Sequence, residues 1–257
     1  MFCAMQFCVA HFIFLVCDMK EYGLIGRPLG HSASAKYFAD KFAIQSIDAH
    51  YSLYELEQIE QVESLRDKLC GFNVTIPYKK QILPFLASVS DEAAQVGAVN
   101  CVKIDAEGKM HGYNTDVVGI RATLSPFELQ GRKALVLGTG GAAAAVLFVL
   151  EQLGMDVVSV SRTEGENRIT YDKVTPELIG SIALIVNATP VGMYPHVDEA
   201  PTIPYDALTP NHILFDLIYN PAKTLFLAFG EQRGAKILGG DEMFRRQAEA
   251  SWEIWNR

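Results

Sequence analysis

The chain has 257 residues, enough for one large domain or two of ordinary size, and we expect two because domains cluster near ~100–150 residues. Apolar residues make up 49% of the chain and charged residues 20%, which excludes a disordered chain, a coiled coil and a collagen. The formal net charge of −8, with no Lys/Arg-rich run, argues against a nucleic-acid partner, since the field that attracts phosphate backbones is missing.

The first 17 residues form an apolar run that only Gln6 and His11 interrupt. The run is short for a transmembrane helix, and it lacks the basic region of a signal peptide because no Lys or Arg precedes Lys20. We therefore predict that the native chain starts at Met19 and that residues 1–18 are a non-native or unstructured leader. A membrane anchor is the alternative interpretation.

The next hundred residues alternate short apolar runs with longer helical periods, which is typical of α/β architecture. Strands are predicted over residues 22–25, 50–53, 71–74 and 100–104, with a hairpin partner at 110–113. Helices are predicted over residues 34–42, 59–69, 78–86, 91–96 and 116–124.

Polar segments follow several of these strands. Ser32 and Ser34 alternate before a helix, a pattern that suits either a helix cap or a carboxylate site. Lys79 lies in the first turn of a proline-started helix, where its positive charge is unfavourable with respect to the helix dipole. Its presence there therefore indicates a role other than stabilising the helix. Asn100 ends the polar segment 97–100, and Asp116 ends the polar segment 112–116. Asp116 could also simply cap the helix that follows.

A second domain is predicted from Arg132 onward, because residues 134–137 are a continuous apolar run of the kind that a strand covered on both faces requires. Further strands are predicted over residues 156–160, 184–187 and 213–217, with helices over 142–153, 224–233 and 241–255.

The first of these strands runs into a G-x-G-x-x-A loop and a helix. This arrangement favours a dinucleotide, since the glycines let the backbone approach a pyrophosphate whose charge meets the helix N-terminus. The next strand ends at Ser161-Arg162-Thr163 without the carboxylate usual for NAD, and an arginine suits a 2′-phosphate, so NADP is predicted. A glycine-rich turn that only packs a helix on a sheet is the alternative.

In their order along the chain, these segments resemble the shikimate dehydrogenase family, and the likeness extends from Met19 to the C-terminus. It rests on the S-x-S loop at Ser32 and Ser34, N-V-T-x-P-x-K ending at Lys79, G-A-V-N ending at Asn100, G-x-N-T-D ending at Asp116, the glycine loop at 138–143, Arg162-Thr163, residues 187–193 and 216–221, and the helix with Gln247.

The chain also departs from the family pattern. Ala35 stands where the family usually has proline, and Phe38-Ala39 stands where it has His-Asn. We expect these changes to affect the rigidity of the substrate loop more than the chemistry. Ser161 stands where asparagine is commoner before the arginine.

The resemblance implies an α/β fold in three parts: an N-terminal α/β substrate-binding domain (19–123), a doubly wound Rossmann NADP-binding domain (124–239), and a C-terminal helix (240–257) that packs back on the first domain. It implies reversible hydride transfer between NADPH and 3-dehydroshikimate to give shikimate, a step of chorismate and aromatic amino-acid biosynthesis. The partner is then a small-molecule substrate, with no nucleic acid and no membrane, and the protein is a monomer or homodimer.

By the same resemblance, Lys79 is the catalytic proton donor and Asp116 is its ion-pair partner. A cation suits this position because hydride arriving at a carbonyl carbon develops negative charge on oxygen. The substrate-binding residues implied are Ser32, Ser34 and Tyr219 around the carboxylate, and Thr75, Lys79, Asn100, Asp116 and Gln247 around the ring hydroxyls. The cofactor-binding residues implied are Gly138, Gly140, Gly141 and Ala142 at the pyrophosphate, Ser161, Arg162 and Thr163 at the 2′-phosphate, Thr189, Met193, Leu217 and Gly240 along the nicotinamide half, and Asp91 at the rim.

Other interpretations stay open. A surface salt bridge is the alternative for the Lys79–Asp116 pair. A quinate/shikimate dehydrogenase that uses NAD is one rival function, and Arg162 argues against it. A non-catalytic NADP or metabolite sensor is another, although a sensor would not need Lys79. The five cysteines are an odd number without C-x-x-C or Cys/His metal spacing, so we expect free thiols, no metal and a cytoplasmic protein.

Overall fold

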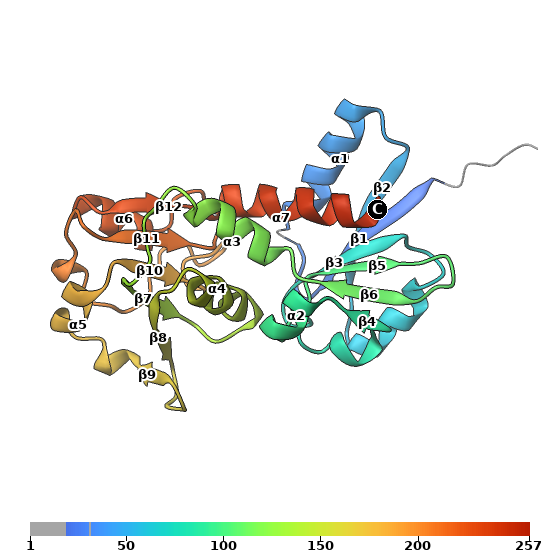
Figure 1. Cartoon of the computed structure of the whole chain (residues 1–257). Coiled ribbons are helices and arrows are strands. Elements are labelled where there is room, and N and C mark those ends of the chain that lie inside the picture. The colour runs from blue at the N-terminus through green and yellow to red at the C-terminus, as the bar shows by residue number, and fades with distance from the viewer. Residues whose placement is uncertain (1–18, 31) are drawn as a thin grey trace, which may run out of the picture.

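The computed structural model describes residues 19–30 and 32–257 and contains two six-stranded sheets (Figure 1). The predicted α/β class is confirmed, whereas the predictions for residues 1–18 lie outside the described residues. Within the described part of the chain, no helix is long and apolar enough to cross a membrane.

The first sheet has the strand order β2-β1-β3-β5-β6-β4. Its strands are β1 (Lys20–Gly26), β2 (Ala49–Glu55), β3 (Gly71–Val74), β4 (Ser88–Val89), β5 (Cys101–Ile104) and β6 (Met110–Tyr113). β1 is parallel to β2 and β3, whereas β5 is antiparallel to both β3 and β6. The helices of this half are α1 (Ser34–Gln45), α2 (Asp91–Val96) and α3 (Asp116–Leu124).

Two of the predicted helices differ in the structure. Residues 59–69 form a 3₁₀ helix over Ile59–Leu65, and residues 78–86 form turns that end in the short 3₁₀ helix Leu83–Phe85. The reason in the second case is Pro84, which has no N–H to donate and whose ring clashes with the carbonyl four residues earlier. The prediction of a helix there was wrong.

The second sheet is entirely parallel, with the order β12-β11-β10-β7-β8-β9. Its strands are β7 (Lys133–Leu137), β8 (Asp156–Ser161), β9 (Arg168–Thr170), β10 (Leu184–Asn187), β11 (Ile213–Asp216) and β12 (Lys236–Leu238). The helices that accompany it are α4 (Gly141–Gln152), α5 (Pro176–Ser181) and α6 (Leu225–Gln232). The strand order reverses at β7, as in a doubly wound dinucleotide-binding sheet, and ligands of such sheets bind where the order reverses.

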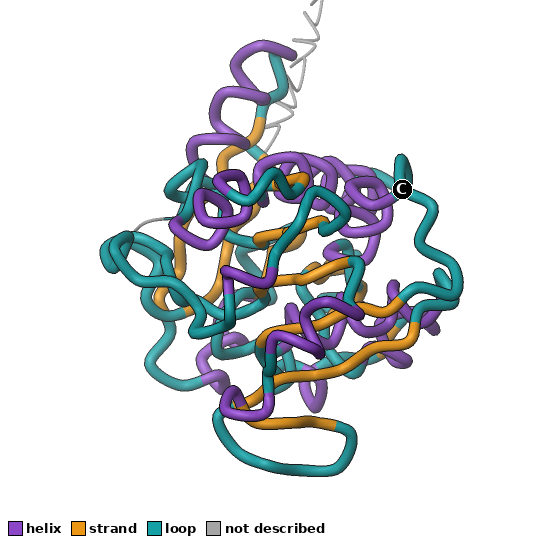
Figure 2. The backbone as a smooth tube through the Cα atoms, turned by 90° about the vertical axis from the view of Figure 1, so that its left-hand side faces the viewer, coloured by secondary structure: helices purple, strands orange, loops and turns teal. Residues whose placement is uncertain are grey.

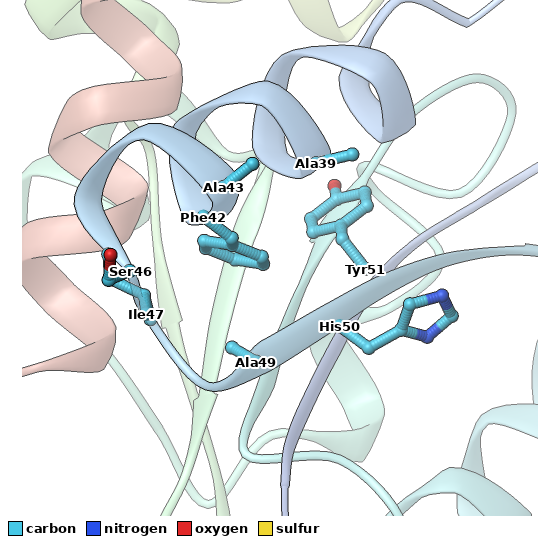
Figure 3. Close-up of a pocket in the computed structure, with 8 residues that line it drawn as sticks. All are labelled: Ala39, Phe42, Ala43, Ser46, Ile47, Ala49, His50 and Tyr51. Carbon is cyan, nitrogen blue, oxygen red and sulfur yellow. The ribbon is translucent and has the colours of Figure 1, made fainter.

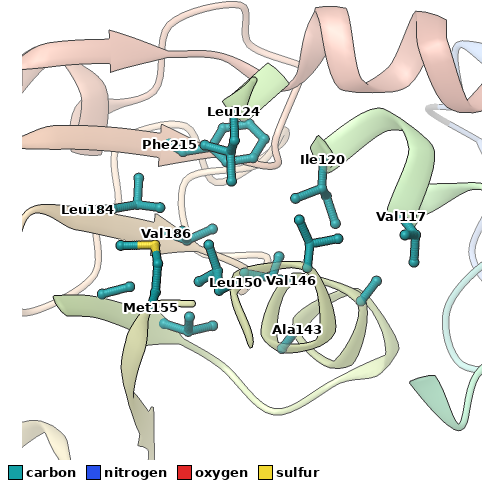
Figure 4. Packing of buried hydrophobic residues seen from close by; sticks show 14 of the residues in the cluster. Val117, Ile120, Leu124, Ala143, Val146, Leu150, Met155, Leu184, Val186 and Phe215 are labelled. Carbon is teal, nitrogen blue, oxygen red and sulfur yellow. The ribbon is translucent and has the colours of Figure 1, made fainter. Parts of the chain in front are cut away.

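The largest core lies between the second sheet and α4, and α3 contributes to it (Figure 4). Val117 and Ile120 from α3 belong to the same buried cluster as Val146 from α4 and Phe215 from β11. The helix that follows the first sheet is therefore anchored in the core of the second.

Helix α7 (Gly240–Trp255) lies along α3 and then continues to the first sheet (Figure 1). Its contact with α3 is close at Gly119, where an added Cβ would lie 2.5 Å from the carbonyl oxygen of Met243. At the far end of α7, the ring of Trp255 stacks on Tyr22 of β1 at 4.8 Å between ring centroids. The chain thus passes between the two sheets twice, through α3 and through α7. Figure 2 shows the backbone turned by 90°, with the helices in purple and the strands in orange.

Candidate functional site

Four strands of the first sheet end or begin on the same side of the sheet. β1 and β3 run parallel and end together, β5 begins opposite the end of β3, and β6 ends opposite the start of β5. Thr75 directly follows β3, Asn100 directly precedes β5, and Asp116 begins α3 shortly after β6. The sheet register therefore collects side chains that are distant in sequence.

The turn that carries Lys79 is fixed by its neighbours. Tyr78 is buried, and its hydroxyl donates to the carbonyl oxygen of Leu56 at 2.7 Å. The carbonyl oxygen of Lys79 accepts from the backbone N–H of Val99 at 2.8 Å. The side chain of Lys79 therefore projects from a restrained backbone.

Lys79 and Asp116 form a largely buried ion pair. The Lys79 Nζ donates to the Asp116 Oδ2 at 2.6 Å, and the two side chains are only 14% and 7% exposed. Water screens such a pair much less than a pair on the surface. The alternative interpretation of this pair as a surface salt bridge is therefore wrong.

Asn100 holds the second oxygen of Asp116. Its Oδ1 accepts from the backbone N–H of Thr115 at 2.6 Å, and its Nδ2 donates to the Asp116 Oδ1 at 2.8 Å. The orientation of this amide is determined, because a backbone N–H can only donate. Each oxygen of Asp116 thus has a donor, and the carboxylate cannot rotate without losing one of them.

Gln247 reaches this cluster from α7. Its Oε1 lies 3.4 Å from the Asn100 Nδ2 and 3.4 Å from the Thr115 Oγ1. One turn later, the fully buried Ser251 contacts Thr115 Oγ1 at 3.0 Å and accepts from Asn73 Nδ2 at 2.8 Å. Sequence reasoning missed Thr115, Ser251 and Asn73. The available signal was the spacing of Ser251, four residues after Gln247 and so on the same helix face.

The S-x-S loop lies between β1 and α1. The backbone N–H of Ser34 donates to the Ser32 Oγ at 3.2 Å, and Ser34 itself is buried. The backbone N–H of Ala33 donates to the hydroxyl of Tyr219 at 3.5 Å, across 186 residues of sequence. Tyr219 follows β11, so the second sheet contributes a hydroxyl to this loop.

The glycine loop joins β7 to α4 at the point where the strand order reverses. Gly138 has φ +111°, and an added Cβ would lie 3.0 Å from the carbonyl oxygen of Ala188. A Cβ at Gly140 would meet open space, so the backbone there is accessible to a ligand. Ala142 is in the first turn of α4, whose N-terminal N–H groups favour an anion.

The glycine loop also touches the ion pair. A Cβ added at Gly141 would lie 3.0 Å from the Cβ of Lys79 and 3.2 Å from its Cδ. The first residue of α4 therefore packs against the stem of the lysine, which joins the two halves of the candidate site.

The tip of β8 is open. Ser161 is buried at the end of the strand, whereas Arg162 and Thr163 are exposed. The backbone N–H of Thr163 donates to the Ser161 Oγ at 3.3 Å. Asp91 is exposed in the first turn of α2, where a carboxylate favours the helix dipole.

The remaining predicted cofactor residues lie where β10 and β11 end. The Thr189 hydroxyl donates to the Asn187 Oδ1 at 2.6 Å, and Met193 is 42% exposed. A Cβ at Gly240 would lie 2.3 Å from the carbonyl oxygen of Leu217, so the start of α7 requires glycine for this close approach.

A separate groove of about 410 Å³ lies between α1 and β2 (Figure 3). The rings of Phe42 and Tyr51 line it, together with several small apolar side chains. Its lining includes none of the predicted site residues, so it is distinct from the Lys79 cluster.

Comparisons with known proteins identify relatives of the whole arrangement. The family model for the shikimate dehydrogenase substrate binding domain matches residues 24–102. A curated relative from Clostridium beijerinckii, named shikimate dehydrogenase (NADP(+)), is 40% identical over 255 residues, which cover 92% of this chain and 92% of the relative.

Solved structures resemble the chain over nearly its full length. Shikimate dehydrogenase 1 from Peptoclostridium difficile has a TM-score of 0.83 at 35% identity, with 93% of this chain and 92% of that chain covered. The enzyme from Thermus thermophilus, solved in complex with NADP(H) and shikimate, has a TM-score of 0.81 at 29% identity, with 92% and 93% covered.

Proposed function

The chain belongs to the shikimate dehydrogenase family, and from this premise we propose that it is an NADP-dependent oxidoreductase that interconverts shikimate and 3-dehydroshikimate. This reaction is a step of chorismate and aromatic amino-acid biosynthesis. The observation that carries the proposal is the buried Lys79–Asp116 pair at 2.6 Å, against which the glycine loop packs. A non-catalytic sensor is distinguished from an enzyme by the turnover measured in the test below.

Lys79 is the proposed proton donor. As hydride reaches the carbonyl carbon at C3, negative charge develops on the carbonyl oxygen, and an ammonium group there stabilises that charge and supplies the proton. Asp116 holds the ammonium group in place, and Asn100 holds Asp116. In the reverse direction, Lys79 takes the proton of the C3 hydroxyl.

The rest of the substrate is proposed to bind around this pair. Thr75, Asn100 and Gln247 bond the ring hydroxyls, because amides and hydroxyls can both donate and accept. The ring carboxylate lies at the S-x-S loop, where Ser32, Ser34 and Tyr219 offer hydroxyl groups from both sheets.

The residues present fit NADP. The accessible backbone at Gly140 and the N-terminus of α4 suit a pyrophosphate, and the exposed Arg162 and Thr163 suit a 2′-phosphate. When bound, NADP supplies or accepts the hydride. Thr189, Met193, Leu217 and Gly240 are proposed to line the nicotinamide half, and Asp91 the rim.

We further propose that the protein acts in the cytoplasm as a monomer or homodimer. In support of a reducing compartment, Cys70 and Cys101 are free thiols.

The test is a kinetic matrix of two substrates, shikimate and quinate, with two cofactors, NADP and NAD. We expect the highest kcat/KM for shikimate with NADP, measured from the absorbance of NADPH. Reduction of NAD at an equal or higher kcat/KM would replace the proposal with an NAD-dependent quinate/shikimate dehydrogenase. Absence of turnover in all four combinations would overturn the proposal of a dehydrogenase.

A further inference from the structure

Three aromatic rings join the S-x-S loop to the second sheet. Phe244 of α7 lies between Tyr37 of α1 and Tyr219 of the segment after β11. Its ring meets Tyr37 edge-on, with centroids 5.5 Å apart and planes at 82°, and meets Tyr219 at 4.8 Å and 37°. We call Tyr37, Phe244 and Tyr219 the aromatic bracket. Edge-to-face and tilted contacts at these distances are favourable beyond the area they bury.

The bracket flanks the proposed carboxylate site. Tyr37 lies one turn after Ser34, at the end of α1 that carries the loop. At the other end of the bracket, the hydroxyl of Tyr219 accepts from the backbone N–H of Ala33. The side chains assigned to the carboxylate thus come from two segments that the bracket connects.

Glu249 adds a polar contact between α1 and α7. The hydroxyl of Tyr37 donates to its Oε1, and the Lys41 Nζ donates to its Oε2 at 2.6 Å. The side chain of Lys41 is only 8% exposed. Burial opposes the ionisation of Glu249, but the bonds from Lys41 and Tyr37 outweigh it and lower the pKa of this carboxyl. Tyr37 is therefore held both at its ring and at its hydroxyl.

We propose that Phe244 and Tyr37 are positioning residues for the substrate carboxylate, which keep the S-x-S loop and Tyr219 at the separation that one carboxylate can bridge. This inference rests on the proposed function, which assigns the carboxylate to Ser32, Ser34 and Tyr219. Without the bracket, binding must order the loop and Tyr219 separately, and that ordering lowers affinity. We expect the transition state at C3 to be unaffected, because the ring contacts of Phe244 are with Tyr37 and Tyr219 and the hydroxyl of Tyr37 bonds Glu249.

The central test compares Phe244→Leu with the matched control Phe229→Leu. Phe229 is also a half-buried ring on a helix, and it contacts Tyr205 at 4.9 Å, away from the loop. We expect Phe244→Leu to raise the KM for shikimate about three- to tenfold, the worth of an aromatic contact, with kcat and the KM for NADP unchanged. The control should leave all three values unchanged. An equal change in both variants, or a loss confined to kcat, would overturn the proposal.

Tyr37→Phe provides a second variant that retains the ring and loses only the bond to Glu249. Tyr37→Phe should raise the KM for shikimate less than Phe244→Leu does. Tyr37→Leu should raise this KM as much as Phe244→Leu does. If Tyr37→Leu leaves this KM unchanged, the bracket has no positioning role.

A neutral ligand separates failure of this inference from failure of the proposed function. The dissociation constants of shikimate and of its methyl ester are measured by calorimetry for the wild type, Ser32→Ala and Phe244→Leu. We expect both variants to weaken shikimate and to leave the ester unchanged. If Ser32→Ala weakens both ligands equally, the assignment of the carboxylate to the S-x-S loop is wrong. If Ser32→Ala discriminates between them and Phe244→Leu does not, the bracket alone is wrong.

Discussion

Each sheet buries a carboxylate at its strand ends, but the two surroundings differ. Asp116, after β6, faces the ammonium group of Lys79 and the amide of Asn100. Asp216, the last residue of β11, accepts from three neutral donors, the hydroxyl of Thr224 at 2.6 Å, the backbone N–H of Ile218 at 3.0 Å and the amide of Asn187 at 3.1 Å.

We infer from this difference that Asp116 belongs to the proposed catalytic pair and that Asp216 has a structural role. Asp116 is 5% exposed and paired with a cation that has a proton to transfer, whereas Asp216 is fully buried and caps the turn that leads to Tyr219. Burial raises the pKa of Asp216 to about 6, although the three hydrogen bonds oppose that rise. A buried carboxylate is thus not by itself the mark of a catalytic group, and its partners decide which role it has.

The largest effect should come from Lys79→Ala. Removing a proton donor that acts mainly in the transition state should lower kcat by about 10²–10⁴, with the KM for shikimate within about an order of magnitude of wild type. The neighbouring exposed Lys80 provides the control, because Lys80→Ala removes the same charge nearby. If Lys79→Ala retains near-normal turnover, the role of Asp116 is structural, like that of Asp216.

Arg162→Ala tests whether the open tip of β8 recognises phosphate. We expect NADP binding to weaken by about 1.5–3 kcal/mol, the range for a hydrogen bond to a charged group, and NAD binding to stay the same. Calorimetric titration with each cofactor measures both, with Arg132→Ala, exposed before β7, as the control. Equal losses for NADP and NAD would show that Arg162 supports structure instead.

Gly119→Ala tests the contact between α3 and α7, the two helices that join these regions. The new methyl group would lie 2.5 Å from the backbone oxygen of Met243, which can move away only if the backbone of α7 shifts. The free energy of unfolding should therefore fall by about 1–3 kcal/mol. Gly180→Ala in α5 is the matched control, because a Cβ there meets nothing within 4 Å, and it should stabilise slightly. The urea concentrations at the midpoint of unfolding are compared between each variant and the wild type. If they shift equally, the helices are not in the close contact described.

Asp216→Asn tests the scaffold carboxylate through pH. The folded-state pKa of about 6 lies above the ordinary value of 3.8, so the folded state binds the proton more tightly. The free energy of unfolding should therefore fall as pH rises through this window, by roughly 1 kcal/mol per pH unit, and stay reduced above it. Asparagine has nearly the same shape and no titratable group, so the variant should lack this part of the slope, whereas the exposed control Asp198→Asn should keep it. Unchanged pH dependence in Asp216→Asn would contradict the assigned pKa.

The fold class could be predicted from the sequence because local patterns carry it. The continuous run at 134–137 followed by glycines defines β7 and its loop, and the structure has a parallel sheet there. The helix predicted over residues 78–86 was wrong, since apolar spacing outweighed the effect of Pro84 in that interpretation.

The site was predictable only in part. Lys79 stood out because its charge opposed the dipole of the predicted helix, whereas Asp116 also had a local interpretation as a helix cap. The structure brings the two together, while their roles remain proposals. Ser251 and Asn73 could not be found in this way, since a buried serine and a strand asparagine look ordinary until the fold places Ser251 of α7 between Asn73 and Thr115. Likewise, no local pattern reveals that Phe244 lies between Tyr37 and Tyr219.

Because Gly141 packs against the stem of Lys79, we expect the two proposed binding sites to depend on each other thermodynamically. A ligand that fixes the glycine loop also restricts the lysine, and a ligand that fixes the lysine restricts the loop. By linkage, the free energy that cofactor binding contributes to substrate affinity equals the free energy that substrate binding contributes to cofactor affinity. Neither dissociation constant is therefore a property of one sheet alone, and each has meaning only with the occupancy of the other site stated.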